Sequence, residues 1–124
     1  MKAISTTKAP AAIGPYSQAI EVGDFIYTSG QIPIDPTTGT FAEGGIKEQT
    51  RQSLQNIKAI LEEAGSAMEK VIKTTVFLSD MNYFADMNSI YAEFFSEPYP
   101  ARSAVAVKTL PKNALIEIEV VATK

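Results

Sequence analysis

Arg102 and Glu117 are the charged residues whose surroundings in the sequence best suit chemistry. Pro100 fixes its own φ and restricts the residue before it, so the backbone leading to Arg102 is stiff. A guanidinium group held on stiff backbone can bind a carboxylate through two parallel hydrogen bonds. Glu117 lies between Ile116 and Ile118, and apolar neighbours of this kind can raise the pKa of a carboxyl group toward the range useful in acid–base catalysis.

Both residues also have plain structural interpretations. Arg102 could lie at the edge of a strand and pair with a surface glutamate, because most arginines are solvated. Glu117 and Glu119 could be the polar positions of a strand with one face in water. The two residues alone do not decide between these interpretations and a binding site.

Tyr16, Gly30 and Asn88 are weaker candidates for a site. Tyr16 follows Gly14-Pro15, a turn that could present its hydroxyl group from rigid backbone, although a packed loop aromatic is the alternative. Ser29 and Gly30 end a run of β-forming residues, and Gly30 could serve only to end that strand. Asn88 shares a predicted helix face with apolar residues, where a lone asparagine is usually a core amide with a hydrogen-bond partner. The aromatic residues of that face are Phe84, Tyr91 and Phe95.

Charge and composition narrow the function classes. The 124-residue chain has a net charge of −3 and no run of basic residues, which argues against nucleic acid as its main partner. It contains no cysteine and no histidine, so thiol nucleophiles, disulfides and thiolate metal sites are excluded and the commonest general base is absent. Any catalysis must use carboxylates, Tyr, Lys, Arg, backbone groups and water.

Length and hydropathy predict one domain over residues 1–124, because no linker or repeat divides the chain. Its 45% hydrophobic and 20% charged content is ordinary for a globular protein. The first residues lack the apolar segment of a signal peptide, and no apolar run approaches about 18 residues. We therefore expect a cytoplasmic protein.

Periodicity predicts an α+β fold. Its elements are strands at residues 2–5, 17–22, 24–31, 71–78, 102–108 and 115–122, and helices at 46–64 and 83–95. Gly65 is predicted to end the first helix and Asn82 to cap the second. The expected architecture is one mixed sheet of about six strands with two helices on one face.

The last two predicted strands read as a hairpin through residues 111–113. Alternation then places Val105 and Val107 on the core side, and Arg102 and Glu117 together on the uncovered side. Because that side mixes charges with small apolar residues, we expect a partner subunit to cover it.

Five motifs resemble the RidA/YjgF family of reactive-intermediate deaminases, in order and over nearly the whole chain. They are Gly14-Pro15-Tyr16-Ser17-Gln18-Ala19, Thr28-Ser29-Gly30-Gln31-Ile32-Pro33, Lys73-Thr74-Thr75-Val76-Phe77-Leu78, Pro100-Ala101-Arg102-Ser103 and Ile116-Glu117-Ile118-Glu119. The resemblance implies a chorismate-mutase-like fold and a homotrimer with sites in the clefts between subunits. It also implies hydrolysis of 2-imino acids to 2-keto acids and ammonia, without a metal or an organic cofactor.

By this resemblance, Arg102 binds the substrate carboxylate and Glu117 handles the attacking water. Residues that line and close the pocket are implied to be Tyr16, Ser29, Gly30 and Asn88. Many members carry a cysteine where this chain has Ala104, and the hydrolysis does not need a thiol.

Two other functions stay open at this point: a small-molecule sensor that binds 2-keto acids without turnover, and a ribonuclease or translation inhibitor. The acidic balance and the absence of histidine weigh against the ribonuclease, and Glu117 favours an enzyme, because carboxylate binding would need only Arg102.

In the predicted hairpin Ala106 lies opposite Glu117, which puts Arg102 about 13 Å further along at about 3.3 Å per residue. We therefore expect a neighbouring subunit to supply one of the two residues to each cleft.

Overall fold

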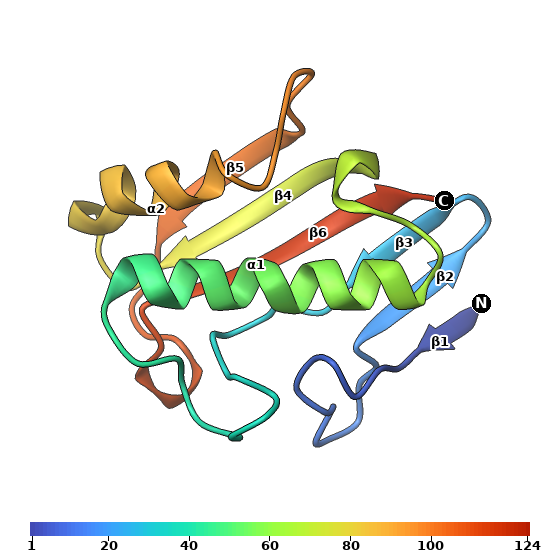
Figure 1. Cartoon of the computed structure of the whole chain (residues 1–124), viewed down its shortest axis with the longest axis horizontal. Helices are drawn as coiled ribbons and strands as arrows, with labels where there is room; N and C mark the ends of the chain where they lie inside the picture. The colour runs from blue at the N-terminus through green and yellow to red at the C-terminus, as the bar shows by residue number, and fades with distance from the viewer.

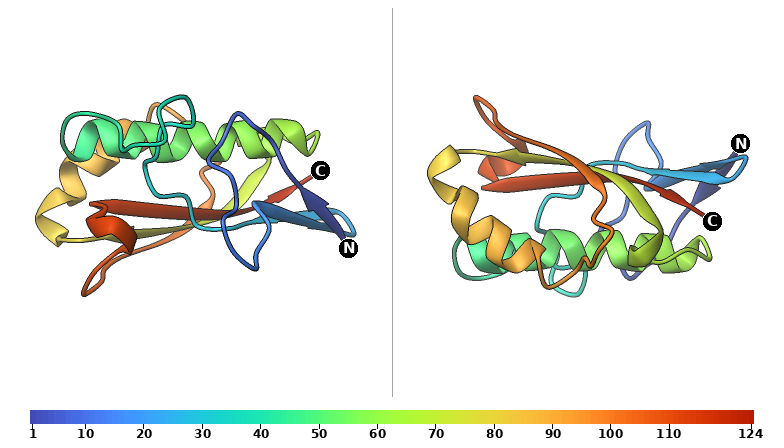
Figure 2. Two further views of the ribbon diagram at one scale, coloured as in Figure 1. Left: turned by 90° about the horizontal axis from the view of Figure 1, so that it is seen from below. Right: turned by 90° about the horizontal axis from the view of Figure 1, so that it is seen from above.

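The computed structural model describes residues 1–124, which form one mixed six-stranded sheet with two helices on one face (Figures 1 and 2). The strand order is β1-β2-β3-β6-β4-β5, and the predicted α+β fold class is confirmed. Neither helix has the length and apolar character needed to cross a bilayer. The strands are β1 (Lys2–Ile4), β2 (Ala19–Val22), β3 (Phe25–Thr28), β4 (Val71–Leu78), β5 (Ala101–Ala106) and β6 (Ile116–Thr123).

Helix α1 (Ile46–Glu63) packs along the sheet as its apolar stripe predicts. Its buried face includes Leu54, Ile57, Ile60 and Leu61, all fully buried. At its start, the Glu48 carboxylate accepts a hydrogen bond of 2.8 Å from the Gly45 amide, which satisfies a free N–H group of the first turn. Gly65 follows the helix with φ of +79°, the left-handed conformation that ends many helices.

Helix α2 (Phe84–Tyr91) is shorter than predicted at both ends. A 3-10 turn (Met81–Tyr83) precedes it, and the Asp80 carboxylate, rather than Asn82, caps this turn by accepting from the Asn82 amide at 2.8 Å. After Tyr91 the backbone tightens into i→i+3 hydrogen bonds, such as Phe94 N to Tyr91 O at 3.0 Å. The regular helix therefore stops before residue 95.

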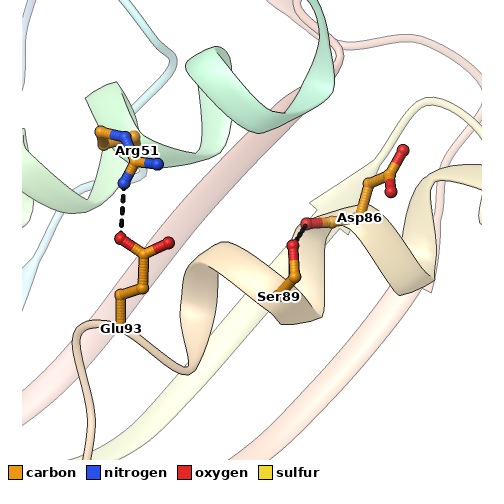
Figure 3. A network of polar contacts seen from close by, with 4 residues as sticks. All are labelled: Arg51, Asp86, Ser89 and Glu93. Carbon is orange, nitrogen blue, oxygen red and sulfur yellow. Dashed lines mark hydrogen bonds and ion pairs between the residues drawn. The ribbon is translucent and has the colours of Figure 1, made fainter.

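Side-chain contacts hold the end of α2 against α1. Arg51 of α1 forms a 2.7 Å ion pair with Glu93, just beyond α2 (Figure 3). One turn earlier in α2, the Ser89 hydroxyl donates to the backbone oxygen of Asp86 at 2.8 Å. The two helices form one layer over the same face of the sheet (Figure 2).

The predicted hairpin between the last two strands is wrong. β5 pairs in parallel with β4 at the edge of the sheet, whereas β6 pairs antiparallel with both β4 and β3. Helix α2 forms the crossover that a parallel pair requires. The chain after β5 then passes the end of β4, through the 3-10 turn Pro111–Asn113, before it enters β6.

This topology separates the two charged residues that were expected on one face. Arg102 lies opposite the buried Thr74 of β4, so Arg102 faces the helices. Phe77 of β4 lies opposite both Glu117 and Val105, so these two residues face the uncovered side. The predicted faces of Arg102 and Val105 are therefore wrong, because alternation fixes a face only when the partner strand and register are known.

The uncovered face does expose apolar side chains, although they are not the ones predicted. Val22, Phe25, Tyr27 and Val105 on this face are each 42–48% exposed. Val22, Phe25 and Tyr27 lie on the neighbouring strands β2 and β3, whereas Val105 is on the edge strand β5.

Candidate functional site

The first group of predicted site residues lies under α2, around Arg102. The guanidinium carbon of Arg102 is 5.3 Å from the ring centre of Phe84 and 4.8 Å from that of Tyr91. Its Nη1 donates to the Asn88 side-chain oxygen at 2.6 Å. Phe84, Asn88 and Tyr91 are spaced four and three residues apart on α2, so one helix face supplies all of these contacts.

Asn88 was expected to have a hydrogen-bond partner, and this partner is Arg102. Tyr91 is fixed in turn by a 2.8 Å hydrogen bond between its hydroxyl group and the buried Thr74 hydroxyl. Burial raises the pKa of Tyr91, against the opposing effects of the Thr74 hydrogen bond and the Arg102 charge. Tyr91 thus stays neutral beneath the guanidinium group.

Arg102 has no carboxylate partner in the chain. The two ion pairs of the structure join Arg51 to Glu93 and Lys124 to Glu21, so the alternative of a surface Arg102–glutamate pair is wrong. Arg102 and Asn88 line an open hollow of about 550 Å³. Its other lining residues are Tyr91, Ala92, Tyr99 and Pro100. An unpaired guanidinium beside such a hollow can bind a small anion.

The second group gathers around Glu117 on the other face of the sheet. Gln31 and Ile118 exchange backbone hydrogen bonds of 2.7 and 3.2 Å, which brings Gly30 against Glu117. A β-carbon added at Gly30 would lie 2.5 Å from the Glu117 carboxylate, so a larger residue here would force the Glu117 side chain to move. Gly30 therefore does more than end a strand.

Glu117 carries a perturbed carboxyl group. Burial raises its pKa, and the negative charge of Glu119 raises it further. The direction agrees with the prediction made from its apolar neighbours. A carboxyl group of this kind exchanges protons closer to neutral pH than an ordinary glutamate does.

Ser29 and Tyr16 are connected to this group through Gly30: Ser29 precedes it in the chain, and Tyr16 shares a hollow with it. The Ser29 hydroxyl donates to the Ser17 backbone oxygen at 2.6 Å, and the Ser29 amide donates to the backbone oxygen of Gln18 at 2.9 Å. Tyr16 is half-exposed rather than packed. Together with Gly30 it lines a hollow of about 210 Å³, whose walls include Ile13, Ile32, Ile34 and Lys112.

One chain does not bring these two groups together. Arg102 of the edge strand β5 lies on the helix side of the sheet with Asn88 of α2, whereas Glu117 faces the opposite side two strands away. No site role was predicted for Phe84, Tyr91 and Thr74. Phe84 and Tyr91 could have been found from the sequence, because both flank Asn88 on its predicted helix face.

Comparison with known proteins places this chain and its fold in a known family. The model of the family described as Endoribonuclease L-PSP matches residues 6–124, so the chain belongs to that family. Solved RidA and YjgF proteins share its fold, which confirms the resemblance found in the motifs.

Among curated relatives, a RutC family protein of Pyrococcus abyssi is 60% identical over 121 residues, covering 98% of this chain and 95% of the relative. The 2-iminobutanoate/2-iminopropanoate deaminase of Salmonella typhimurium is 52% identical over 126 residues, covering 99% of this chain and 98% of the relative.

Two solved structures are similar to this chain over its whole length. RidA from the Antarctic bacterium Psychrobacter superposes with a TM-score of 0.96 at 47% identity, and 100% of both chains is covered. TdcF of Escherichia coli, solved with bound serine, superposes with a TM-score of 0.95 at 46% identity, covering 100% of this chain and 99% of that one.

Proposed function

We propose that this protein hydrolyses reactive 2-imino acids, or their enamine tautomers, to 2-keto acids and ammonia. The observation that carries the proposal is Arg102, an unpaired guanidinium that opens onto a hollow and is held by Asn88 and two aromatic rings. The deaminase named among the relatives supports the reaction type. Serine bound to TdcF carries a carboxylate beside a nitrogen-bearing carbon, as a 2-imino acid does.

We propose further that the active site is a cleft between subunits of a homotrimer. Arg102 and Glu117 lie on opposite faces of one sheet, whereas a 2-imino acid spans only about 5 Å from carboxylate to imine nitrogen. Arg102 and Asn88 of one chain would meet Tyr16, Ser29, Gly30 and Glu117 of its neighbour. The exposed apolar residues of the uncovered face provide a surface for that association.

In the proposed reaction, Arg102 binds the carboxylate and orients the adjacent C2 atom. The substrate reacts as the protonated imine. The oxygen of a water molecule forms a bond to C2, the π electrons of the C2=N bond move to nitrogen, and Glu117 accepts a proton from the water, which gives a neutral carbinolamine. Glu117 then returns the proton to the amino group, and the C2–N bond breaks as ammonia leaves. Loss of the hydroxyl proton to the released ammonia completes the 2-keto acid.

An imine carbon is already electrophilic, so positioning and proton transfer are sufficient and no covalent nucleophile is needed. No electrons are transferred, and the proposed steps use neither a metal nor an organic cofactor. Ala104 faces the helices beside Val76 and takes no part in these steps. We place the reaction in the cytoplasm, where pyridoxal-phosphate enzymes release such imines.

The test couples a threonine or serine dehydratase to the purified protein and follows the appearance of the 2-keto acid. The expected result is a rate above spontaneous hydrolysis that rises with the concentration of this protein. An Arg102→Ala variant at the same concentration serves as the control. No acceleration by the wild-type chain, together with measurable 2-keto acid binding, would instead support a sensor without turnover.

A further inference from the structure

Gln18 is a buried polar residue whose whole side chain is used to hold a loop. It is only 3% exposed, and its Oε1 accepts from the Thr6 amide at 2.6 Å. Its Nε2 lies 3.0, 3.4 and 2.7 Å from the backbone oxygens of Thr6, Ala9 and Pro10. The donors and the acceptor of the amide group are therefore all engaged with the loop that precedes it.

The same loop is fixed at its other end by Ser29. The Ser29 hydroxyl and amide donate to the backbone oxygens of Ser17 and Gln18. Residues 11–16 are thus closed between two sets of hydrogen bonds, one at residues 6–10 and one at residues 17–18. Tyr16 lies at the end of this closed segment, beside Gly30 in the 210 Å³ hollow.

Hydrophobic packing contributes little to the closed segment. Ala11, Ile13, Gly14, Pro15 and Tyr16 are all exposed, and Ile13 is 79% exposed. A loop that buries so little apolar surface depends on its hydrogen bonds for a defined conformation. Gln18 supplies most of those bonds on the N-terminal side.

We propose that Gln18 is a positioning residue, which fixes the loop 6–17 so that Tyr16 is presented beside Gly30, the residue that approaches Glu117. This inference rests on the proposed function of that site. Gln18 acts through the loop and not on the substrate, because its own polar atoms are already bonded to backbone. Its effect on the reaction must therefore pass through Tyr16.

The kinetic test is a double-mutant cycle between Gln18→Glu and Tyr16→Ala in the coupled assay. Glu keeps the size of Gln but turns a carboxylate oxygen toward the three backbone oxygens. We expect Gln18→Glu alone to lower kcat/KM about tenfold, mainly through KM, and to have less than a twofold effect when Tyr16 is already Ala. An equal loss in both backgrounds would overturn the proposal.

Two additions keep the test decisive. Gln18→Met removes the amide without adding charge and replaces Gln18→Glu if that variant does not fold. Ser66→Ala removes another buried hydrogen bond, from the Ser66 hydroxyl to Thr123 O at 2.6 Å, and should lower Tm while leaving kcat/KM within twofold of wild type.

Amide hydrogen exchange provides a readout that does not depend on activity. The Thr6 and Tyr16 amides should exchange faster in the Gln18 variants than in wild type and in Ser66→Ala. If the wild-type chain does not accelerate imine hydrolysis, the proposed function fails, and this exchange measurement still decides whether Gln18 fixes the loop. Unchanged protection of both amides would contradict the inference.

Discussion

Arg102 is held in a fixed orientation by contacts that leave its charge unpaired. The rings of Phe84 and Tyr91 lie 5.3 and 4.8 Å from its guanidinium carbon, and Asn88 occupies one N–H group. The remaining N–H groups can meet a carboxylate in the plane of the guanidinium, which is the geometry of a bidentate pair. At the scale of single residues, the site is therefore organised before a substrate binds.

The first prediction concerns this guanidinium. Arg102→Lys should lower kcat/KM roughly a hundredfold, because an ammonium group cannot reproduce the two parallel hydrogen bonds or the contact with the rings. The coupled dehydratase assay measures the effect, and thermal unfolding checks that the variant is folded. Activity close to wild type would remove Arg102 from the role of carboxylate clamp.

The second prediction separates Glu117 from Glu119. Glu117→Gln should still bind a 2-keto acid but lose turnover by roughly 10² to 10⁴, because the amide cannot accept the proton of the attacking water. Glu119→Gln, two residues along the same strand, should keep most of its turnover at neutral pH. Equal losses at both positions would point to the general negative charge of β6 instead.

The third prediction follows from the raised pKa of Glu117. Glu117 must be ionised to accept a proton, so kcat/KM should fall as the pH drops through this raised pKa. Glu119→Gln removes the negative neighbour that contributes to the shift, which lowers the pKa of Glu117 and moves the acid limb of the pH–rate profile to lower pH. A limb that stays in place or moves upward would contradict this electrostatic account.

At the scale of elements, the unit β4-α2-β5 builds the Arg102 group. The parallel pairing of β4 and β5 sets Arg102 beside Thr74, and α2 crosses above them with Phe84, Asn88 and Tyr91. Each element has a separate part: β5 carries Arg102, α2 supplies the groups that contact its guanidinium, and Thr74 of β4 holds the Tyr91 hydroxyl group.

The fourth prediction uses two variants of Tyr91 to separate its ring from its hydroxyl group. Tyr91→Phe leaves the buried Thr74 hydroxyl without its partner, so it should lower the free energy of unfolding by about 1–3 kcal/mol with little change in KM. Tyr91→Leu also removes the ring from Arg102 and should raise KM roughly three- to thirtyfold. Denaturant unfolding and the coupled assay measure the two effects, and equal KM values would contradict a role for the ring.

Local patterns in the sequence predicted the elements well and their pairing poorly. The β-branched run at 71–78 and the stripe ending at Gly65 located β4 and α1 closely, because both signals arise within a few residues. The β5–β6 hairpin failed because which strand lies next to β5 depends on the whole sheet. Once that neighbour was wrong, the faces of Arg102 and Val105 were wrong as well.

The sequence motifs could name candidate site residues but not their arrangement. Motif resemblance singled out Arg102, Glu117, Tyr16, Gly30 and Asn88, and the structure divides these residues into two groups on opposite faces. The Asn88–Arg102 hydrogen bond and the close approach of Gly30 to Glu117 are long-range contacts. No local pattern in the sequence encodes them.

At the scale of the whole molecule, Arg102 and Glu117 lie on opposite faces of one sheet, so the proposed site cannot form within one chain. The expectation of a shared cleft began from a hairpin that does not exist, yet the observed sheet separates Arg102 and Glu117 more completely than that hairpin would. A closed ring of three chains would pair each Arg102 group with a neighbour's Glu117 group in three equivalent clefts. The apolar side chains of the uncovered face would be buried by the same association.

The most direct test of this account mixes Arg102→Ala chains with Glu117→Gln chains under conditions of subunit exchange. If each cleft takes Arg102 from one chain and Glu117 from its neighbour, about one cleft in four of an equal random mixture has both residues intact. The account predicts that activity in the coupled assay returns to about a quarter of the wild-type level, although each variant alone is nearly inactive. A mixture no more active than its separate components would contradict the shared cleft.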